Sequence, residues 1–395
     1  MARKIVFWTH LVIGVAAGVA ILVMSVTGVL LAFERQVLQF VDRDLRTVAV
    51  PADTATRPLA EMLSTVAASR GAQPTAIVVR PGAASAVELA LGREGSVFVD
   101  PYTGAILGEG SKKARGIFGA VERVHRTLGE PLRSRGPLRA FGAASNLVFL
   151  LLALSGPYLW LPRRWSWAAV RSGSIFRLSL RGRARDFNWH NSVGLWCALP
   201  LVLITATGVV MSYPWANALL FRLAGSPVPS RPGGPGGPGG PARPEGGARP
   251  DAGGRTSAAP TLAADLDRAA AVAGASRTDW RTMTLRIPAP TDTKVSVSLD
   301  AGTGGQAEKR TEVVVDTQSG QIVKTTGFAD GSLGQRLRVL ARFTHTGESL
   351  GLPGQAIAAL ASAGGALLVW TGLSLAWRRL RAWRSRRPLE DAAAA

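Results

Sequence analysis

Hydrophobic residues are concentrated in four runs that are long enough to cross a lipid bilayer. Each run is close to the roughly 20 apolar residues that a spanning helix needs, and none carries a charge in its middle. The first run is too long for the apolar part of a signal peptide, which is about 7–15 residues. The pattern therefore predicts a membrane protein with four transmembrane helices, at residues 11–33, 138–161, 193–213 and 355–377.

The two long connections between these runs show the alternation that is typical of strands. Each begins with a helical period, at 59–69 and 262–273, and then reaches short alternating runs. Each ends in an Asp-x-x-Ser/Thr-Gly turn, in which Gly104 or Gly320 closes a hairpin. We expect two small extracytoplasmic α+β modules with strands at 75–80, 86–91, 96–99, 282–287, 293–299 and 312–315.

The halves of the chain repeat one another. At the start of both the first and the third run stands a histidine, followed by a glycine four residues later and by a Thr-Gly pair whose threonine is 17 residues later. The second and fourth runs match more loosely, through Ser155-Gly156 and Thr371-Gly372. The sequence therefore predicts an internal duplication in which each half is a helix, an α+β module and a second helix.

The insert at 225–260 interrupts this repeat. It is dominated by Gly and Pro, which cannot bury enough apolar surface to fold, so we expect it to be flexible. The expected organisation is a helix at 1–34, a module at 35–115, an outer segment and helix at 116–162, a basic loop at 163–189, a helix at 190–214, the insert, a module at 261–335, an outer segment and helix at 336–378, and a basic tail at 379–395.

Charge predicts the orientation in the membrane. The two termini and the loop between the second and third runs carry 15 Lys and Arg against three acidic residues. The positive-inside rule therefore places both termini in the cytoplasm. The net charge of +20 then reflects topology and contact with anionic lipid, and we expect no nucleic-acid partner.

The four histidines of the chain stand at the edges of the apolar runs. Topology and the repeat both pair His10 with His190 at the cytoplasmic face and His125 with His345 at the outer face. Two facing helices can each supply one axial imidazole to a haem iron. A haem here would be noncovalent, because Cys197 is the only cysteine and no C-x-x-C-H is present. Zinc or copper fits less well, since two histidines make a poor closed site.

Glycines accompany the histidines at spacings that suit a bound macrocycle. Gly14 and Gly194 lie one helical turn from His10 and His190 and leave room for a flat ring. Gly28 and Gly208 lie roughly 26 Å along the helices from His10 and His190, at the depth expected for the second haem. We also expect Trp196 and Trp370, which lie inside the spans, to pack in the core.

Four stretches then carry a resemblance to a known family. They resemble the PepSY-associated transmembrane family, a group of iron-regulated bacterial inner-membrane proteins that includes ferric-siderophore reductases. The resemblance covers nearly the whole chain except the insert and the residues after about 387. The stretches are W-T-His10-x3-Gly14, His125-R-T-L-G-E, F-N-W-His190-x3-Gly194-L-W and T-His345-T-G-E, with the turns at Asp100 and Asp316 similar to those that end PepSY-type modules.

The resemblance implies an enzyme, a ferric-siderophore reductase that serves iron uptake at the inner membrane. It implies two haem b groups held by His10, His190, His125 and His345. The expected partners are a ferric siderophore or other outer acceptor, and a separate cytoplasmic reductase or membrane quinol as donor, because no flavin reductase module follows Trp377. Two alternatives remain open: a non-enzymatic regulator whose modules bind or inhibit a periplasmic peptidase, and a permease, which would need more polar residues in its spans.

Overall fold

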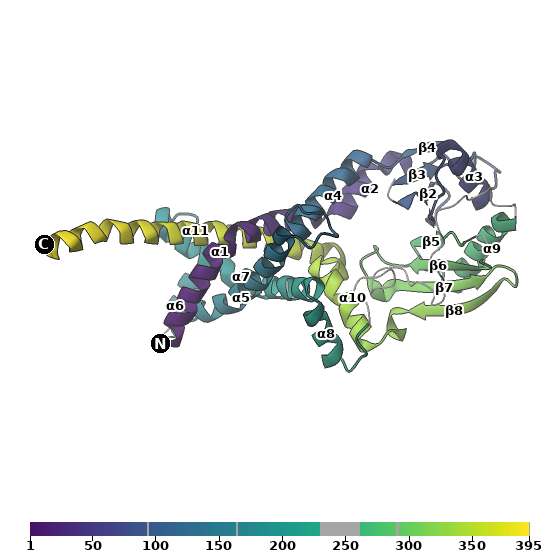
Figure 1. Cartoon of the computed structure of the whole chain (residues 1–395). Coiled ribbons are helices and arrows are strands. Elements are labelled where there is room, and N and C mark those ends of the chain that lie inside the picture. Colours follow the sequence, from purple (N-terminus) through teal and green to yellow (C-terminus); the bar gives the residue numbers. More distant parts are fainter. Residues whose placement is uncertain (93–94, 163–164, 230–260, 290–291, 395) are drawn as a thin grey trace. The chain divides into compact units, whose positions relative to one another are not determined.

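The computed structural model describes residues 1–92, 95–162, 165–229, 261–289 and 292–394, which form two compact units (Figure 1). We call them the helical unit and the sheet unit. Most of the expected flexible insert lies outside the described residues. The helical unit consists of Met1–Glu34, Ile117–Leu220 and Leu340–Ala395, and the sheet unit consists of Arg35–Gly116 and Phe221–Val339.

Four long helices make up most of the helical unit, and each is long and apolar enough to cross a membrane. The chain is thus a membrane protein with four candidate spans. Each helix packs against two of the others, in the closed order α1, α5, α7, α11 and back to α1. This is a four-helix bundle of α1 (Ala2–Leu31), α5 (Pro137–Trp160), α7 (Gly182–Ser212) and α11 (Gly351–Ala394).

Small residues allow these helices to approach closely. A Cβ at Gly364 would lie 2.5 Å from Sγ of Cys197, and one at Gly365 would lie 3.1 Å from the Phe149 ring. Close backbone approach is the usual way in which helices associate in lipid, where the hydrophobic effect gives no drive for packing.

Two of the long helices extend beyond the apolar runs that predict them. The third helix begins eight residues before His190, because Asn188 fixes a polar extension of α7: its amide accepts from the backbone N–H of Arg177 and donates to the carbonyl of Ile175. That contact ties α7 to the segment after α6 (Trp167–Ser174). The expected basic tail instead continues α11 to Ala394, since its Arg, Ala and Leu residues favour helix.

The strands of the two expected modules join in one antiparallel sheet of eight strands. Its order is β4-β3-β2-β1-β5-β6-β7-β8, so the halves meet where β1 pairs with β5 and Ile77 lies opposite Leu285. Both hairpin turns form as expected, with Gly104 and Gly320 in the left-handed region. The strands are β1 (Ala76–Val79), β2 (Val87–Ala90), β3 (Ser96–Val99), β4 (Ile106–Glu109), β5 (Thr282–Arg286), β6 (Lys294–Asp300), β7 (Arg310–Asp316) and β8 (Gln321–Gly327).

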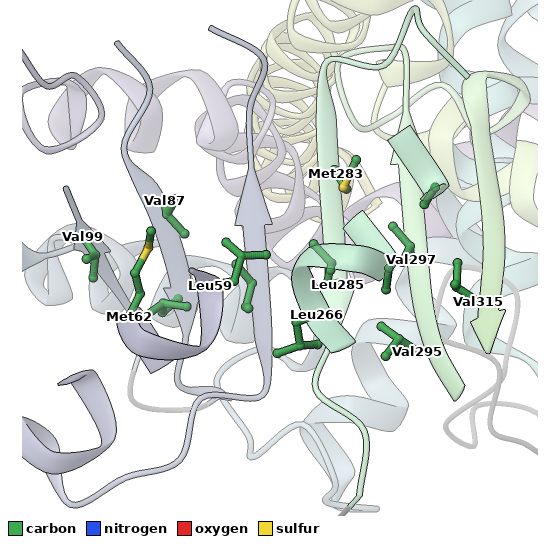
Figure 2. Packing of buried hydrophobic residues seen from close by; sticks show 14 of the residues in the cluster. Leu59, Met62, Val87, Val99, Leu266, Met283, Leu285, Val295, Val297 and Val315 are labelled. Atoms are coloured by element: carbon green, nitrogen blue, oxygen red, sulfur yellow. The ribbon is translucent and has the colours of Figure 1, made fainter. Parts of the chain in front are cut away.

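The core of the sheet unit lies between this sheet and two helices, α3 (Leu59–Arg70) and α9 (Thr261–Ser276). Figure 2 shows apolar side chains from both halves in this layer, among them Met62, Leu266 and Val297. The carboxylate of Asp267 accepts from the backbone N–H of Leu59, so α9 helps to cap the start of α3. The two halves therefore share a single core.

The element order shows the duplication directly. In each half a spanning helix is followed by a short helix, a helix on the sheet, four strands, an amphipathic helix and a second spanning helix. The remaining elements of this pattern are α2 (Glu34–Val41) and α4 (Lys112–Thr127) in the first half, and α8 (Pro214–Leu223) and α10 (Leu333–His345) in the second.

Candidate functional site: two histidine pairs

The structure brings the four histidines together in the two pairs that the sequence predicts. His10 of α1 and His190 of α7 have ring centroids 6.5 Å apart and ring planes at 84°. His125, in the last turn of α4, and His345, the last residue of α10, have centroids 6.2 Å apart and planes at 63°. Each pair takes one histidine from each half of the chain.

The two pairs lie near opposite ends of the bundle. His10 is in the first third of α1, whereas His125 contacts Thr27 near the C-terminal end of the same helix, with 2.9 Å between Nδ1 and Oγ1. Seventeen residues of helix separate these positions, which corresponds to roughly 26 Å. The bundle therefore places one imidazole pair toward each face of the membrane.

A hydroxyl group lies against Nδ1 of every histidine, and it comes from the Ser/Thr-Gly pairs of the repeat. In each case the hydroxyl and the imidazole belong to the same half of the chain but to different helices. The sequence places these pairs at the right depth but does not reveal this contact. The Nδ1 to Oγ distances are 2.8 Å for His10 and Ser155, 2.9 Å for His125 and Thr27, 3.0 Å for His190 and Thr371, and 3.3 Å for His345 and Thr207.

The glycine of each pair lies beside the same ring in three of the four cases. A Cβ would lie 3.5 Å from Cε1 of His125 at Gly28, 3.2 Å from Cε1 of His345 at Gly208, and 3.3 Å from Cε1 of His190 at Gly372. At Gly156 no atom lies within 4 Å of such a Cβ. The first three glycines therefore make room for an imidazole, and Gly156 has space to spare.

Gly14 and Gly194, which the sequence also indicates, lie elsewhere in the packing. A Cβ at Gly14 would be 3.6 Å from the side chain of Leu152, and one at Gly194 would be 3.5 Å from that of Leu368. Both are ordinary van der Waals distances to a neighbouring helix. They are equivalent positions of the two halves.

Burial keeps the second pair uncharged. It lowers the pKa of His125 to about 4, with a smaller contribution from the neighbouring His345, and it also lowers the pKa of His345. Both rings are therefore neutral at physiological pH. A neutral imidazole is the form that binds a metal ion.

The donor set suits haem iron better than a bare metal ion. The described residues contain no group of three or more His, Cys, Asp or Glu side chains able to hold a metal, whereas a closed zinc site needs four ligands. With metal–nitrogen bonds of about 2 Å, two imidazoles on one metal have centroids about 6 Å apart, which is close to the spacing in both pairs. A haem needs only these axial ligands, since its macrocycle supplies the others.

A buried carboxylate near the first pair is a feature that the sequence reasoning missed. Asp186 lies on α7 one turn before His190 and is 1% exposed. It forms ion pairs with Arg185 at 2.8 Å and with Arg378 of α11 at 3.4 Å. The signal in the sequence is a lone acidic residue in an otherwise basic stretch. Asp186 therefore joins the start of α7 to α11 just beyond the apolar run of that helix.

The expectation that Trp196 and Trp370 pack in the core is wrong. Their side chains are exposed on the outside of the bundle, and Nε1 of Trp196 donates to the carbonyl of Ser174. An apolar ring on the outer surface of a spanning helix contacts lipid, so the hydrophobic pattern alone does not distinguish it from a core residue.

Comparison with known proteins gives one family. The model of the PepSY-associated TM region matches residues 7–379, a range that contains all four histidines and the four hydroxyl groups beside them. No curated protein matches the chain.

Proposed function

The chain belongs to the PepSY-associated TM region family, and from that premise we propose that it is a transmembrane electron-transfer protein with a b-type haem at each histidine pair. The observation that carries the proposal is the pairing itself. Four histidines from four different helices form two facing pairs with nearly equal spacing, at opposite ends of an apolar bundle.

The residues of the chain perform distinct tasks in this function. His10 and His190 would hold one haem, and His125 and His345 the other, while the apolar bundle excludes water from both. When bound, haem supplies one-electron redox chemistry, which the side chains of this protein do not supply themselves. Each haem would be held by one histidine from each half of the chain.

We further propose that the acceptor is chelated Fe(III) on the outer side of a bacterial inner membrane. The excess of Lys and Arg at the termini and in the loop before α7 favours a cytoplasmic position for the His10–His190 pair. The His125–His345 pair and the sheet unit would then face the outside. A hard oxygen chelator binds Fe(II) more weakly than Fe(III), so reduction would release the iron for uptake. A cytoplasmic reductase or a membrane quinol would supply the electrons.

A haem assay on the purified full-length protein tests the proposal. We expect a reduced-minus-oxidised spectrum of b type and two haems per chain in a pyridine haemochrome assay. His10→Ala and His345→Ala should each remove one haem, and a different one. Asn191→Ala is the matched control, because Asn191 neighbours His190 but its amide donates within its own helix, to the carbonyl of Phe187.

The outcomes separate the proposal from its alternative. Absence of haem from the wild-type protein would contradict the proposal and favour a regulator whose sheet unit binds a periplasmic peptidase. Retention of both haems in the two histidine variants would contradict the assigned ligands.

A further inference from the structure

The hydroxyl groups beside the histidines also hydrogen-bond to carbonyls of their own helices, and these bonds indicate the direction of their contact with the imidazoles. The hydroxyl of Thr27 donates to the carbonyl of Val23 at 2.6 Å, and that of Thr371 donates to the carbonyl of Leu367 at 2.7 Å. Ser155 and Thr207 make the same bond four residues back, each at 2.7 Å. All four hydroxyl protons are therefore already directed at a carbonyl.

A hydroxyl has a single proton but can accept through its oxygen. With the proton on the helix carbonyl, the oxygen can only accept from the imidazole, so Nδ1 must carry a hydrogen. A neutral imidazole protonated at Nδ1 has its lone pair at Nε2. Among the described residues no hydrogen bond reaches Nε2 of any of the four histidines, so this nitrogen is left for a metal.

His345 provides an independent check on this assignment. Its Nδ1 lies 2.8 Å from the carbonyl oxygen of Ile204, closer than the 3.3 Å to Oγ1 of Thr207. A carbonyl can only accept, so Nδ1 of His345 carries the proton whatever the hydroxyl does. The tautomer deduced from the hydroxyl groups agrees with the one that the carbonyl requires.

We propose, building on the haem sites proposed above, that Thr27, Ser155, Thr207 and Thr371 are positioning residues that hold Nε2 of each histidine toward iron and tune the reduction potential. An acceptor on Nδ1–H makes the imidazole a stronger donor and fixes the ring orientation. A stronger axial donor stabilises the ferric state relative to the ferrous state, and so lowers the potential.

The histidines of one pair differ in how strongly each depends on the hydroxyl group beside it. His345 keeps the closer carbonyl of Ile204 when Thr207 loses its hydroxyl. His125 also has a backbone partner, at Met24, but its Nδ1 lies 2.9 Å from Oγ1 of Thr27, closer than the 3.3 Å between His345 and Thr207. Both histidines belong to one pair, so the same substitution at Thr27 and at Thr207 should act on the same haem with different strength.

A redox titration of the full-length, haem-loaded protein, followed by visible absorption, tests this proposal. Valine keeps the shape of threonine but has no hydroxyl. We expect Thr27→Val to lower the ratio of the site's affinity for ferric haem to its affinity for ferrous haem about tenfold. This would raise the reduction potential of the haem at the His125–His345 pair by about 59 mV. Thr207→Val should shift the same component less, and Thr27→Ser should restore the wild-type value.

Thr205→Val is the matched control. Thr205 is buried on the same helix as Thr207 and its hydroxyl makes the same bond, to the carbonyl of Leu201 at 2.7 Å, but among the described residues it hydrogen-bonds to no histidine. Its valine variant should leave both potentials unchanged.

The possible results are distinct. An unchanged potential in Thr27→Val, an equal shift in Thr205→Val, or a Thr27→Ser variant that behaves like the valine variant would each overturn the proposal. If Thr27→Val loses haem, recovery of haem in Thr27→Ser supports the proposal and failure to recover it counts against it. A wild-type protein without haem would instead overturn the proposed function itself.

Discussion

Replacing two glycines of the Ser/Thr-Gly pairs, Gly208 and Gly156, by alanine tests whether the rings occupy the positions described. At Gly208 the new Cβ would lie 3.2 Å from Cε1 of His345 and 3.0 Å from Nδ2 of Asn146. Carbon atoms in contact prefer about 3.5–4.0 Å, so the ring or the amide must move by a few tenths of an ångström. At Gly156 the new Cβ would meet no atom within 4 Å.

The free energies of the two variants follow from these distances. Alanine stabilises a helix by about 0.5–1 kcal/mol relative to glycine, and this gain applies at both positions. Overpacking typically costs about 1–3 kcal/mol. We therefore expect Gly156→Ala to stabilise the protein by up to about 1 kcal/mol, and Gly208→Ala to destabilise it by about 0–2 kcal/mol and to weaken only the His125–His345 site.

Thermal unfolding in detergent and haem content per chain measure the two effects. Every 1.4 kcal/mol corresponds to about a tenfold change in an equilibrium constant, so partial loss of one haem on dilution of Gly208→Ala is measurable. Equal behaviour of the two variants, or loss of the His10–His190 haem in Gly208→Ala, would refute the packing argument.

Two further predictions concern charge. Burial lowers the pKa of His125 from 6.5 to about 4, so between these pH values the unfolded chain binds a proton that the folded chain does not, and the free energy of unfolding falls as the pH falls from about 6.5 toward 4. Thermal unfolding in detergent should therefore shift to lower temperature between pH 6.5 and 4, and an unfolding temperature that stays constant over this range would contradict the burial argument. Asp186→Asn removes the carboxylate that pairs with Arg185 and Arg378. Because both arginines are partly exposed, we expect a loss of only about 1–2 kcal/mol in thermal unfolding, and Arg378→Ala should have a smaller effect; the reverse order would contradict the central position of Asp186.

Much of the fold and the pairing of the histidines could be predicted because they depend on local pattern and repetition. The apolar runs, the helices at 59–69 and 262–273 and the Gly104 and Gly320 turns all depend on residues close together in the chain. Pairing His10 with His190 needed only the repeat and the topology. These signals are independent of how side chains pack.

Other features depend on which elements become neighbours, and the sequence does not specify that. Ser155 contacts a histidine 145 residues away, and only the packing of α1 against α5 makes this contact possible. The pairing of β1 with β5 also has no separate signal, because either module could offer several edge strands. The early start of α7 depends on the contact of Asn188 with the carbonyl of Ile175, in the segment between α6 and α7, and this contact forms only when that segment folds back on the helix.

The contacts around the histidines give the duplication a structural consequence. Within the first half, α5 holds His10 through Ser155 and α1 holds His125 through Thr27; the second half repeats this arrangement. Yet each imidazole pair joins one half to the other. One half alone would therefore orient two imidazoles but would offer each proposed haem site a single histidine. If both sites hold haem as proposed, a lesion that separates the halves should remove both haems at once, whereas a lesion at one histidine should remove one.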